Sequence, residues 1–134
     1  MMAVLKVLDA YAILAFLEDE PSADQVRNLL LRAEEGKAQL AMTVVNLGEV
    51  WYAIARSGSQ DLADRLTQEL QGMAIEMVEV DWALTRAAAT LKAKGKVSYA
   101  DCFAAALAKL RKGEVVTGDP EFKHLEGDVK IVWL

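Results

Sequence analysis

Four carboxylates lie where an apolar run ends or where a helix is expected to begin: Asp9, Glu49, Asp101 and Asp119. Taken singly, the three aspartates are adequate helix caps, because a helix N-terminus has unpaired N–H groups and favours negative charge. Glu49 differs, since the second turn of its expected helix has no unpaired donor for it. An ordinary exposed helix position is the alternative for Glu49. If the fold brings the four together, they form a cation site.

The elements that must position these acids follow from the hydrophobic pattern. We expect strands at residues 4–8, 39–42, 75–80, 115–117 and 129–133. We expect helices at residues 11–17, 22–36, 44–56, 60–72, 81–95 and from Ser98 onward, with a short turn capped by Asp119. Because strands that alternate with helices need crossover connections, the sequence predicts an α/β fold. The expected architecture is a three-layer α/β/α sandwich around a mostly parallel sheet of about five strands, and residues 1–134 form one domain.

This topology indicates that the acids converge. In an open parallel sheet, the carboxyl ends of the strands and the starts of the following helices lie along one edge, where such folds bind ligands. Carboxylates held close together repel one another unless a cation compensates. Oxygen ligands without His or Cys favour Mg²⁺ or Mn²⁺. Asp81 occupies an equivalent junction between a strand and a helix, so five candidates remain at this point.

The composition limits the partners of the chain. Twenty acids against fifteen bases give a formal charge of −5, which predicts no general electrostatic attraction to nucleic acid or anionic lipid. A polyanionic substrate must therefore be held by a metal or by a small basic patch. The apolar stretch 11–17 is too short to cross a bilayer, and Asp9 precedes it where a signal peptide has a basic residue, so we expect a cytoplasmic protein.

Other chemistries lack their residues. The single Cys102 excludes an internal disulfide, and no motif links it to the single His124, so both are interpreted as structural or incidental. The chain has no glycine-rich phosphate loop, dinucleotide fingerprint or serine-hydrolase elbow. A hydrolase built from this chain would take its nucleophile from a metal-polarised water. Two metals roughly 3.5–4 Å apart would then favour phosphodiester cleavage.

Four segments together resemble the PIN-domain family, specifically the small ribonucleases of VapC-type toxin–antitoxin pairs. The segments, in order, are Val-Leu-Asp9-Ala-Tyr-Ala-Ile-Leu, Asn46-Leu-Gly-Glu49-Val, Ser98-Tyr-Ala-Asp101-Cys-Phe-Ala-Ala-Ala and Val-Val-Thr117-Gly-Asp119-Pro-Glu-Phe. The resemblance covers essentially the whole chain. It implies a PIN-like nuclease domain that cleaves single-stranded RNA, works as a homodimer and is inhibited by a cognate antitoxin.

The resemblance also assigns roles to residues. It implies that Asp9, Glu49, Asp101 and Asp119 are catalytic and hold Mg²⁺ or Mn²⁺, with two ions during catalysis, and it removes Asp81 by placing it at a sheet edge. Thr117 would add a hydroxyl near the site, although a polar strand end explains it nearly as well.

Residues for RNA contact are less well defined. The best local candidates are Lys92, Lys94, Lys96 and Arg56, while a solvated helix end explains the lysines equally well. Tyr11 departs from the small polar residue that relatives often carry there, and its ring either narrows the cleft or packs inward. Four aromatic residues could line the partner surfaces that the resemblance implies: Tyr11, Phe16, Trp51 and Tyr52. Aromatic residues at helical spacing are more often core, so we assign them no site role.

Three alternatives remain open. The first is a non-catalytic binding module with the PIN fold, and the second is a housekeeping RNA-processing nuclease. The third is a receiver-like signalling domain, which shares the alternating layout but needs an acidic pair and a lysine that the motifs around Asp9 and Asp81 do not supply.

Overall fold

A five-stranded sheet forms the centre of the computed structural model, which describes residues 3–134. Its strands are β1 (Leu5–Leu8), β2 (Gln39–Thr43), β3 (Glu76–Val78), β4 (Glu114–Thr117) and β5 (Lys130–Trp133). They run in the order β3-β2-β1-β4-β5, and all four neighbouring pairs are parallel. The predicted α/β fold with a central sheet is confirmed, and the sheet is parallel throughout.

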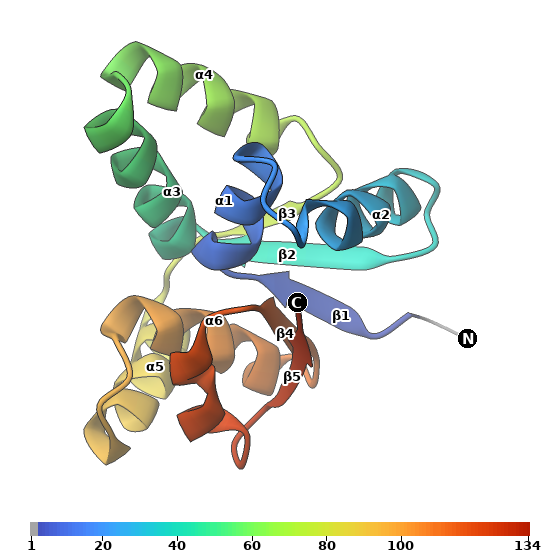
Figure 1. The fold of residues 1–134 in the computed structure, drawn as a ribbon. Coiled ribbons are helices and arrows are strands. Elements are labelled where there is room, and N and C mark those ends of the chain that lie inside the picture. The colour runs from blue at the N-terminus through green and yellow to red at the C-terminus, as the bar shows by residue number, and fades with distance from the viewer. Residues whose placement is uncertain (1–2) are drawn as a thin grey trace.

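Helices cover both faces of the sheet (Figure 1). One layer contains α1 (Ala10–Leu17), α2 (Ala23–Glu34), α3 (Val44–Ser57) and α4 (Gln60–Gln71), and the other contains α5 (Trp82–Lys94), α6 (Tyr99–Leu110) and the short 3₁₀ helix η1 (Pro120–Leu125). Successive strand side chains point to opposite faces, so Val7 packs in the core beneath α5 and α6 while Leu8 packs in the core beneath α1 to α4. Burial on both faces explains why the strands read as continuous apolar runs rather than alternating ones.

Side-chain caps fix most of the helix starts as predicted. Asp9, Thr43, Asp81 and Ser98 each accept a hydrogen bond from a backbone N–H in the first turn of the following helix. Gly36 has a φ of 73°, which is the left-handed conformation expected after α2. The side chain of Ser22 accepts no such bond, so the cap expected before α2 does not form. The third strand is also shorter than predicted, because at the sheet edge only residues 76–78 pair with β2.

The strand order reverses between β1 and β4. From β1 the chain proceeds outward to β2 and β3 and then returns to the other side of β1 to form β4 and β5. Ligands of open α/β sheets bind in the crevice at the carboxyl ends of the strands beside such a reversal. A receiver-like domain has the order 2-1-3-4-5, so that alternative is wrong for this chain. Within residues 3–134, no helix combines the length and apolar character that spanning a bilayer requires.

Candidate metal centre

Asp9 is held rigidly at the carboxyl end of β1. Its side chain is 1% exposed. One carboxylate oxygen accepts the N–H of Ala12 at 2.9 Å, and the other accepts the hydroxyl of Thr117 at 2.5 Å. Thr117 Oγ1 in turn accepts the N–H of Asp119 at 3.0 Å. Thr117 is therefore more than a polar strand end, because its hydroxyl joins the ends of β1 and β4 at the reversal point.

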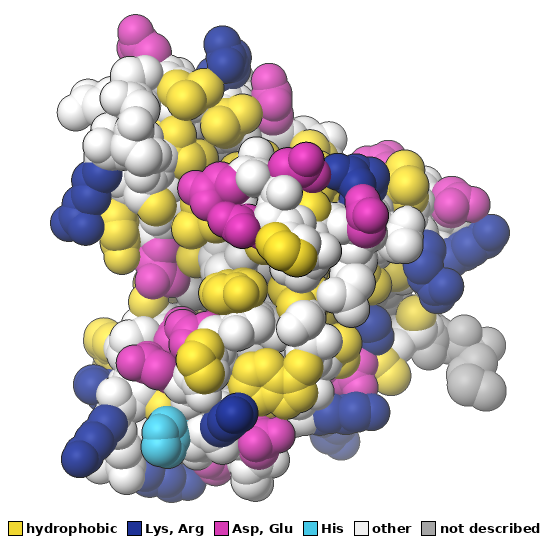
Figure 2. Space-filling view, viewed as in Figure 1, with side chains coloured by type: hydrophobic (Ala, Val, Ile, Leu, Met, Phe, Trp, Pro, Cys, Tyr) yellow, Lys and Arg dark blue, Asp and Glu magenta, His cyan; other side chains and the backbone are white. Residues whose placement is uncertain are grey.

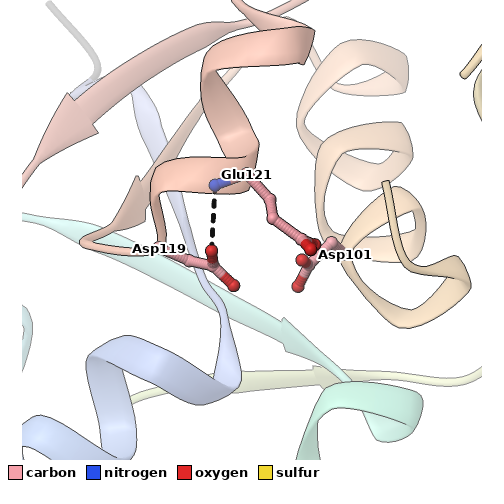
Figure 3. Close-up of side chains that lie close together, drawn as sticks. All are labelled: Asp101, Asp119 and Glu121. Atoms are coloured by element: carbon pink, nitrogen blue, oxygen red, sulfur yellow. Dashed lines mark hydrogen bonds between the residues drawn. The ribbon is translucent and has the colours of Figure 1, made fainter. Parts of the chain in front are cut away.

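Three further carboxylates approach one another beside this pair. Ligand oxygens of Asp101, Asp119 and Glu121 all lie within 4.8 Å of one another. Figure 3 shows Asp101 at the start of α6 facing Asp119 and Glu121, which come from the turn after β4. The N–H of Glu121 donates to Asp119 Oδ1 at 2.9 Å, so the cap of η1 also fixes the spacing of the two acids.

Sequence reasoning missed Glu121. The Asp-Pro-Glu sequence at residues 119–121 carried a signal, because proline at the first helical position holds the turn and leaves an acid in that turn. Such an acid is normally explained by the helix dipole alone. Only the packing of α6 against this turn shows that the carboxylate of Glu121 faces Asp101.

A buried polar network orients Glu49. Asn46 is fully buried, and its amide nitrogen donates to Glu49 Oε1 at 3.0 Å and to the carbonyl oxygen of Ala100 at 3.1 Å. The hydroxyl of Thr43 donates to Asn46 Oδ1 at 2.6 Å. Asn46 thus ties α3 to the start of α6 and turns Glu49 toward the other acids. Asn46 stands in the Glu49 motif, but its position in the sequence gives no sign of this role.

The four predicted acids lie close enough for the charge of one to shift the pKa of another. Burial is the main cause that raises the pKa of Asp9 to about 7, and the charges of Asp119 and Glu49 add to it while the bonds from Thr117 and Ala12 oppose it. The pKa of Asp101 is also raised to about 7, first by burial and then by the charges of Asp119, Asp9 and Glu49. Burial and then the charge of Asp119 raise the pKa of Glu49.

The fifth candidate lies elsewhere. Asp81 caps α5 by accepting the N–H of Leu84 at 2.8 Å, and it follows the edge strand β3. Asp81 is not among the neighbours whose charges raise the pKa of Asp9 or Asp101. Its position therefore agrees with a capping role.

The predicted RNA-contact residues have mixed surroundings. Lys92 donates to the carbonyl oxygen of Val97 at 3.0 Å, and Lys94 lies 3.4 Å from a carboxylate oxygen of Asp128. Lys96 is exposed, and the guanidinium of Arg56 lies 5.0 Å from the ring centroid of Tyr52. Their contact with RNA stays a prediction.

Cys102 and His124, the two other side chains that could react, have different surroundings. Cys102 is buried in the core beneath α5 and α6, which agrees with its structural interpretation. His124 is exposed on η1.

The donor set fits a hard divalent cation. Asp9, Glu49, Asp101, Asp119 and Glu121 supply only carboxylate oxygens, the ligands that Mg²⁺ and Mn²⁺ prefer. Three of these acids, Asp9, Glu49 and Asp101, have raised pKa values, so full ionisation of the group near neutral pH needs positive charge beside it. Figure 2 shows acidic side chains where the surface is hollowed between the two helix layers. Glu121 is exposed and Asp119 is half-buried, so the cluster is open to solvent on this side.

The PIN domain family model matches residues 6–128. The chain belongs to the PIN domain family. The matched range includes all five carboxylates of the cluster. No match was found among curated proteins.

Solved structures show the same PIN fold at low identity. The chain is 16% identical to one in DNA-bound VapBC from Salmonella typhimurium, with 98% of each chain covered and a TM-score of 0.72. It is 23% identical to one in VapBC-5 from Mycobacterium tuberculosis, with 98% and 99% covered and a TM-score of 0.65. It is 14% identical to VapC20 of the same organism, a sarcin–ricin loop cleaving toxin, with 89% and 92% covered and a TM-score of 0.68.

The raised pKa values of the PIN cluster predict how stability depends on pH. Asp9 and Asp101 have folded pKa values of about 7 against an ordinary 3.8, so the folded state binds more protons between these values. The free energy of unfolding of the cation-free protein should therefore fall as the pH rises toward about 7 and level off above it. One such shift corresponds to about 4 kcal/mol at most, and the two groups are coupled, so the total is smaller than twice that.

Urea unfolding in EDTA at about pH 5.5 and about pH 8 measures this loss. Glu76 and Glu114 have lowered pKa values, which make the protein more stable as the pH rises. This gain is complete below about pH 5.5, so it does not change stability between the two measurements. Mn²⁺ should restore more stability at the higher pH than at the lower. A free energy of unfolding that rises across the window in EDTA would contradict the prediction.

Proposed function

We propose that the chain is an Mg²⁺- or Mn²⁺-dependent endoribonuclease that cleaves single-stranded RNA, and that it is the toxin of a toxin–antitoxin pair. The observation that carries the proposal is the convergence of Asp9, Glu49, Asp101 and Asp119 at the reversal point of the sheet, with two of their pKa values raised to about 7. Carboxylates in this arrangement are expensive to ionise without a cation. A binding module with the same fold would gain nothing from carboxylates that repel one another.

The cation ligands divide between two groups. Asp101, Asp119 and Glu121 approach within 4.8 Å of one another, while Asp9 and Glu49 are held by separate hydrogen bonds on β1 and α3. This division supports two ions during catalysis. When bound, such ions polarise a water nucleophile and neutralise charge on the phosphodiester.

The residues of the chain supply orientation and proton control. Thr117 fixes Asp9 through its hydroxyl, and Asn46 fixes Glu49 through its amide. Asp9 and Asp101 carry protons for part of the time near neutral pH and give them up when positive charge arrives, so cation binding should release protons and tighten as the pH rises.

A protein partner is the second part of the proposal. Solved relatives include toxin–antitoxin complexes, one of them from Klebsiella pneumoniae. An apolar hollow of about 330 Å³ between α1 and α2 supports a bound antitoxin helix here, and it is lined by Phe16, Arg27, Leu30, Leu31, Glu34 and Met73. Leu31 is 55% exposed in this hollow. We also propose a homodimer and a cytoplasmic location, where RNA and antitoxin are both present.

The direct test is cleavage of an unstructured, end-labelled RNA by purified protein. We expect internal cleavage that requires Mg²⁺ or Mn²⁺, stops with EDTA and returns when Mn²⁺ is added in excess. The oligodeoxynucleotide of the same sequence serves as the control and should stay intact. Cleavage that persists in EDTA would contradict the metal-dependent mechanism, and calorimetry without Mn²⁺ binding would favour the binding module instead.

The toxin assignment needs a second experiment, because a housekeeping nuclease would pass the first. Induced expression should arrest growth, and co-expression of a small protein encoded immediately upstream should restore it. Growth that continues despite active enzyme would favour the housekeeping nuclease.

A further inference from the structure

All three tyrosines of the chain have exposed rings. Tyr11, Tyr52 and Tyr99 are 45%, 46% and 44% exposed. Tyr11 and Tyr52 therefore lie on the surface and not in the core, because α1 and α3 turn these residues toward solvent while Ile13 and Val50 fill the core beneath them. An exposed tyrosine is not unusual by itself. The rings of Tyr11 and Tyr52, however, lie beside the acids, and this position calls for an explanation.

Tyr11 rests against the backbone of the acidic site. A Cβ atom added to Gly118 would lie 2.3 Å from Cε1 and 2.9 Å from Oη of Tyr11, which no real side chain tolerates. Gly118 connects Thr117, which bonds Asp9, to Asp119. The ring thus lies over the backbone of Gly118, where any added side chain would have to displace it, and it forms a wall of the site. Because Tyr11 is exposed, its ring narrows the cleft and does not pack inward.

Tyr52 lies on α3 near Glu49. It follows Glu49 by three residues, so the two side chains are neighbours on one face of α3. Arg56 continues this stripe one turn further, with its guanidinium 5.0 Å from the ring centroid of Tyr52. An aromatic ring next to a cation is the combination with which proteins hold single strands, the ring stacking on a base and the cation attracting the backbone.

Tyr99 provides an internal contrast. It precedes Asp101 by two residues on α6, and residues at that spacing do not face each other on a helix. Its ring instead packs against Phe103, with the centroids 5.0 Å apart. Tyr99 is as exposed as the other two tyrosines but does not border the acids.

We propose that Tyr11 and Tyr52 are stacking surfaces for unpaired nucleobases next to the scissile phosphate, and that they select single-stranded over paired substrates. The inference rests on the proposed nuclease function and names the residues that recognise its substrate. A chain with a net charge of −5 gains little from general attraction to a polyanion, so contacts that do not depend on charge must supply affinity. Base stacking is such a contact, and only an unpaired strand offers free base faces. Figure 2 shows hydrophobic side chains, among which tyrosine is coloured, beside acidic ones around the hollow.

The test uses a 2′-O-methyl RNA of roughly ten nucleotides, with 2-aminopurine placed at successive positions, in the presence of Mn²⁺. Fluorescence anisotropy measures binding, and quenching of 2-aminopurine measures stacking. Tyr11→Ala and Tyr52→Ala should each weaken binding roughly tenfold and should each remove quenching at a different position of the strand. Tyr11→Phe and Tyr52→Phe keep the ring and should behave like the parent, and Tyr99→Ala is the matched control that should also leave binding unchanged.

Gly118→Ala gives an independent test of the Tyr11 ring. The added methyl should displace the ring and weaken binding in the parent but have little further effect in the Tyr11→Ala background, because the clashing group is then absent. Unchanged binding and quenching in both tyrosine-to-alanine variants would overturn the inference, as would an equal loss in Tyr99→Ala.

Failure of this inference is distinguishable from failure of the proposed function. If the parent protein cleaves RNA but the alanine variants bind and quench normally, only the stacking surfaces are wrong. If the parent binds and quenches the probe, the alanine variants lose this quenching and the parent cleaves no RNA, the stacking surfaces stand and the nuclease is wrong. A parent that binds no nucleic acid overturns both.

Discussion

Replacing Asp9 by asparagine should abolish RNA cleavage and at the same time make the cation-free protein more stable at about pH 8. Asparagine keeps an oxygen for the N–H of Ala12 and an amide beside Thr117, so the cap of α1 and the link to β4 survive. The substitution removes the buried carboxylate charge of residue 9, and burial of this charge is the main cause that raises the pKa of Asp9 to about 7. Loss of residues that merely support a metal ligand costs 10- to 100-fold, so loss of a ligand charge should cost on the order of 10³-fold or more.

The gain in the free energy of unfolding should be roughly 1–3 kcal/mol at that pH and should shrink as the pH falls. It should vanish only below the ordinary Asp pKa of 3.8, where residue 9 carries no charge in either protein, folded or unfolded. Cleavage kinetics with Mn²⁺ and urea unfolding in EDTA measure the two effects. Asp81→Asn is the matched control, because it makes the same substitution at a helix cap that follows a strand outside the cluster. It should retain cleavage and show no pH-dependent gain. RNA cleavage retained by Asp9→Asn would contradict the metal-site assignment.

Asn46→Ala has the second largest expected effect, and it acts on both stability and activity. The substitution removes the bonds to Glu49 and Ala100 and leaves the hydroxyl of Thr43 without its acceptor in a fully buried position. Unsatisfied buried groups and a small cavity should together lower the free energy of unfolding by roughly 2–4 kcal/mol. Glu49 keeps its charge but loses its orientation, so cleavage should fall about 10- to 100-fold and need more Mn²⁺.

Urea unfolding and an Mn²⁺ titration of cleavage measure these changes. Asn28→Ala removes the other asparagine of the chain, which is exposed on α2, and should leave stability and the Mn²⁺ requirement nearly unchanged. If Asn46→Ala lowers stability but the protein that remains folded cleaves with the parental Mn²⁺ requirement, Asn46 has only a structural role. A parental free energy of unfolding would contradict the buried network itself.

The candidate acids could be named from sequence because each follows a local signal. Asp9, Asp101 and Asp119 are caps or first-turn acids, and the structure shows the corresponding backbone bonds at or beside each residue. Caps depend on contacts within one helical turn, which the order of residues specifies directly. The mostly parallel sheet was also predictable, because a helix between two strands usually forms a crossover that leaves the strands parallel. The predicted capping hydrogen bond of the Ser22 side chain does not form. A cap needs an extended backbone at the capping residue, and Ser22 instead has a ψ of 3°.

Other parts of the site depend on contacts between residues far apart in the sequence. The order β3-β2-β1-β4-β5 places the ends of β1 and β4 side by side, and this neighbourhood lets Thr117 reach Asp9 across 108 positions of the chain. The packing of α6 against η1 brings Glu121 to Asp101, and the seat of Tyr11 on Gly118 exists only because α1 begins beside the end of β4.

The sequence by itself determined the elements, their caps and a short set of acids, since these follow from propensity, periodicity and contacts within a turn. The tertiary structure alone decided that Glu121 belongs to the cluster and that Asp9 and Asp101 have pKa values near 7. The spacing of the residues left Asp81 open, and the fold places it as a cap after the edge strand. The physical reason is that desolvation and Coulomb repulsion depend on what the fold buries and brings together, and no local pattern specifies either.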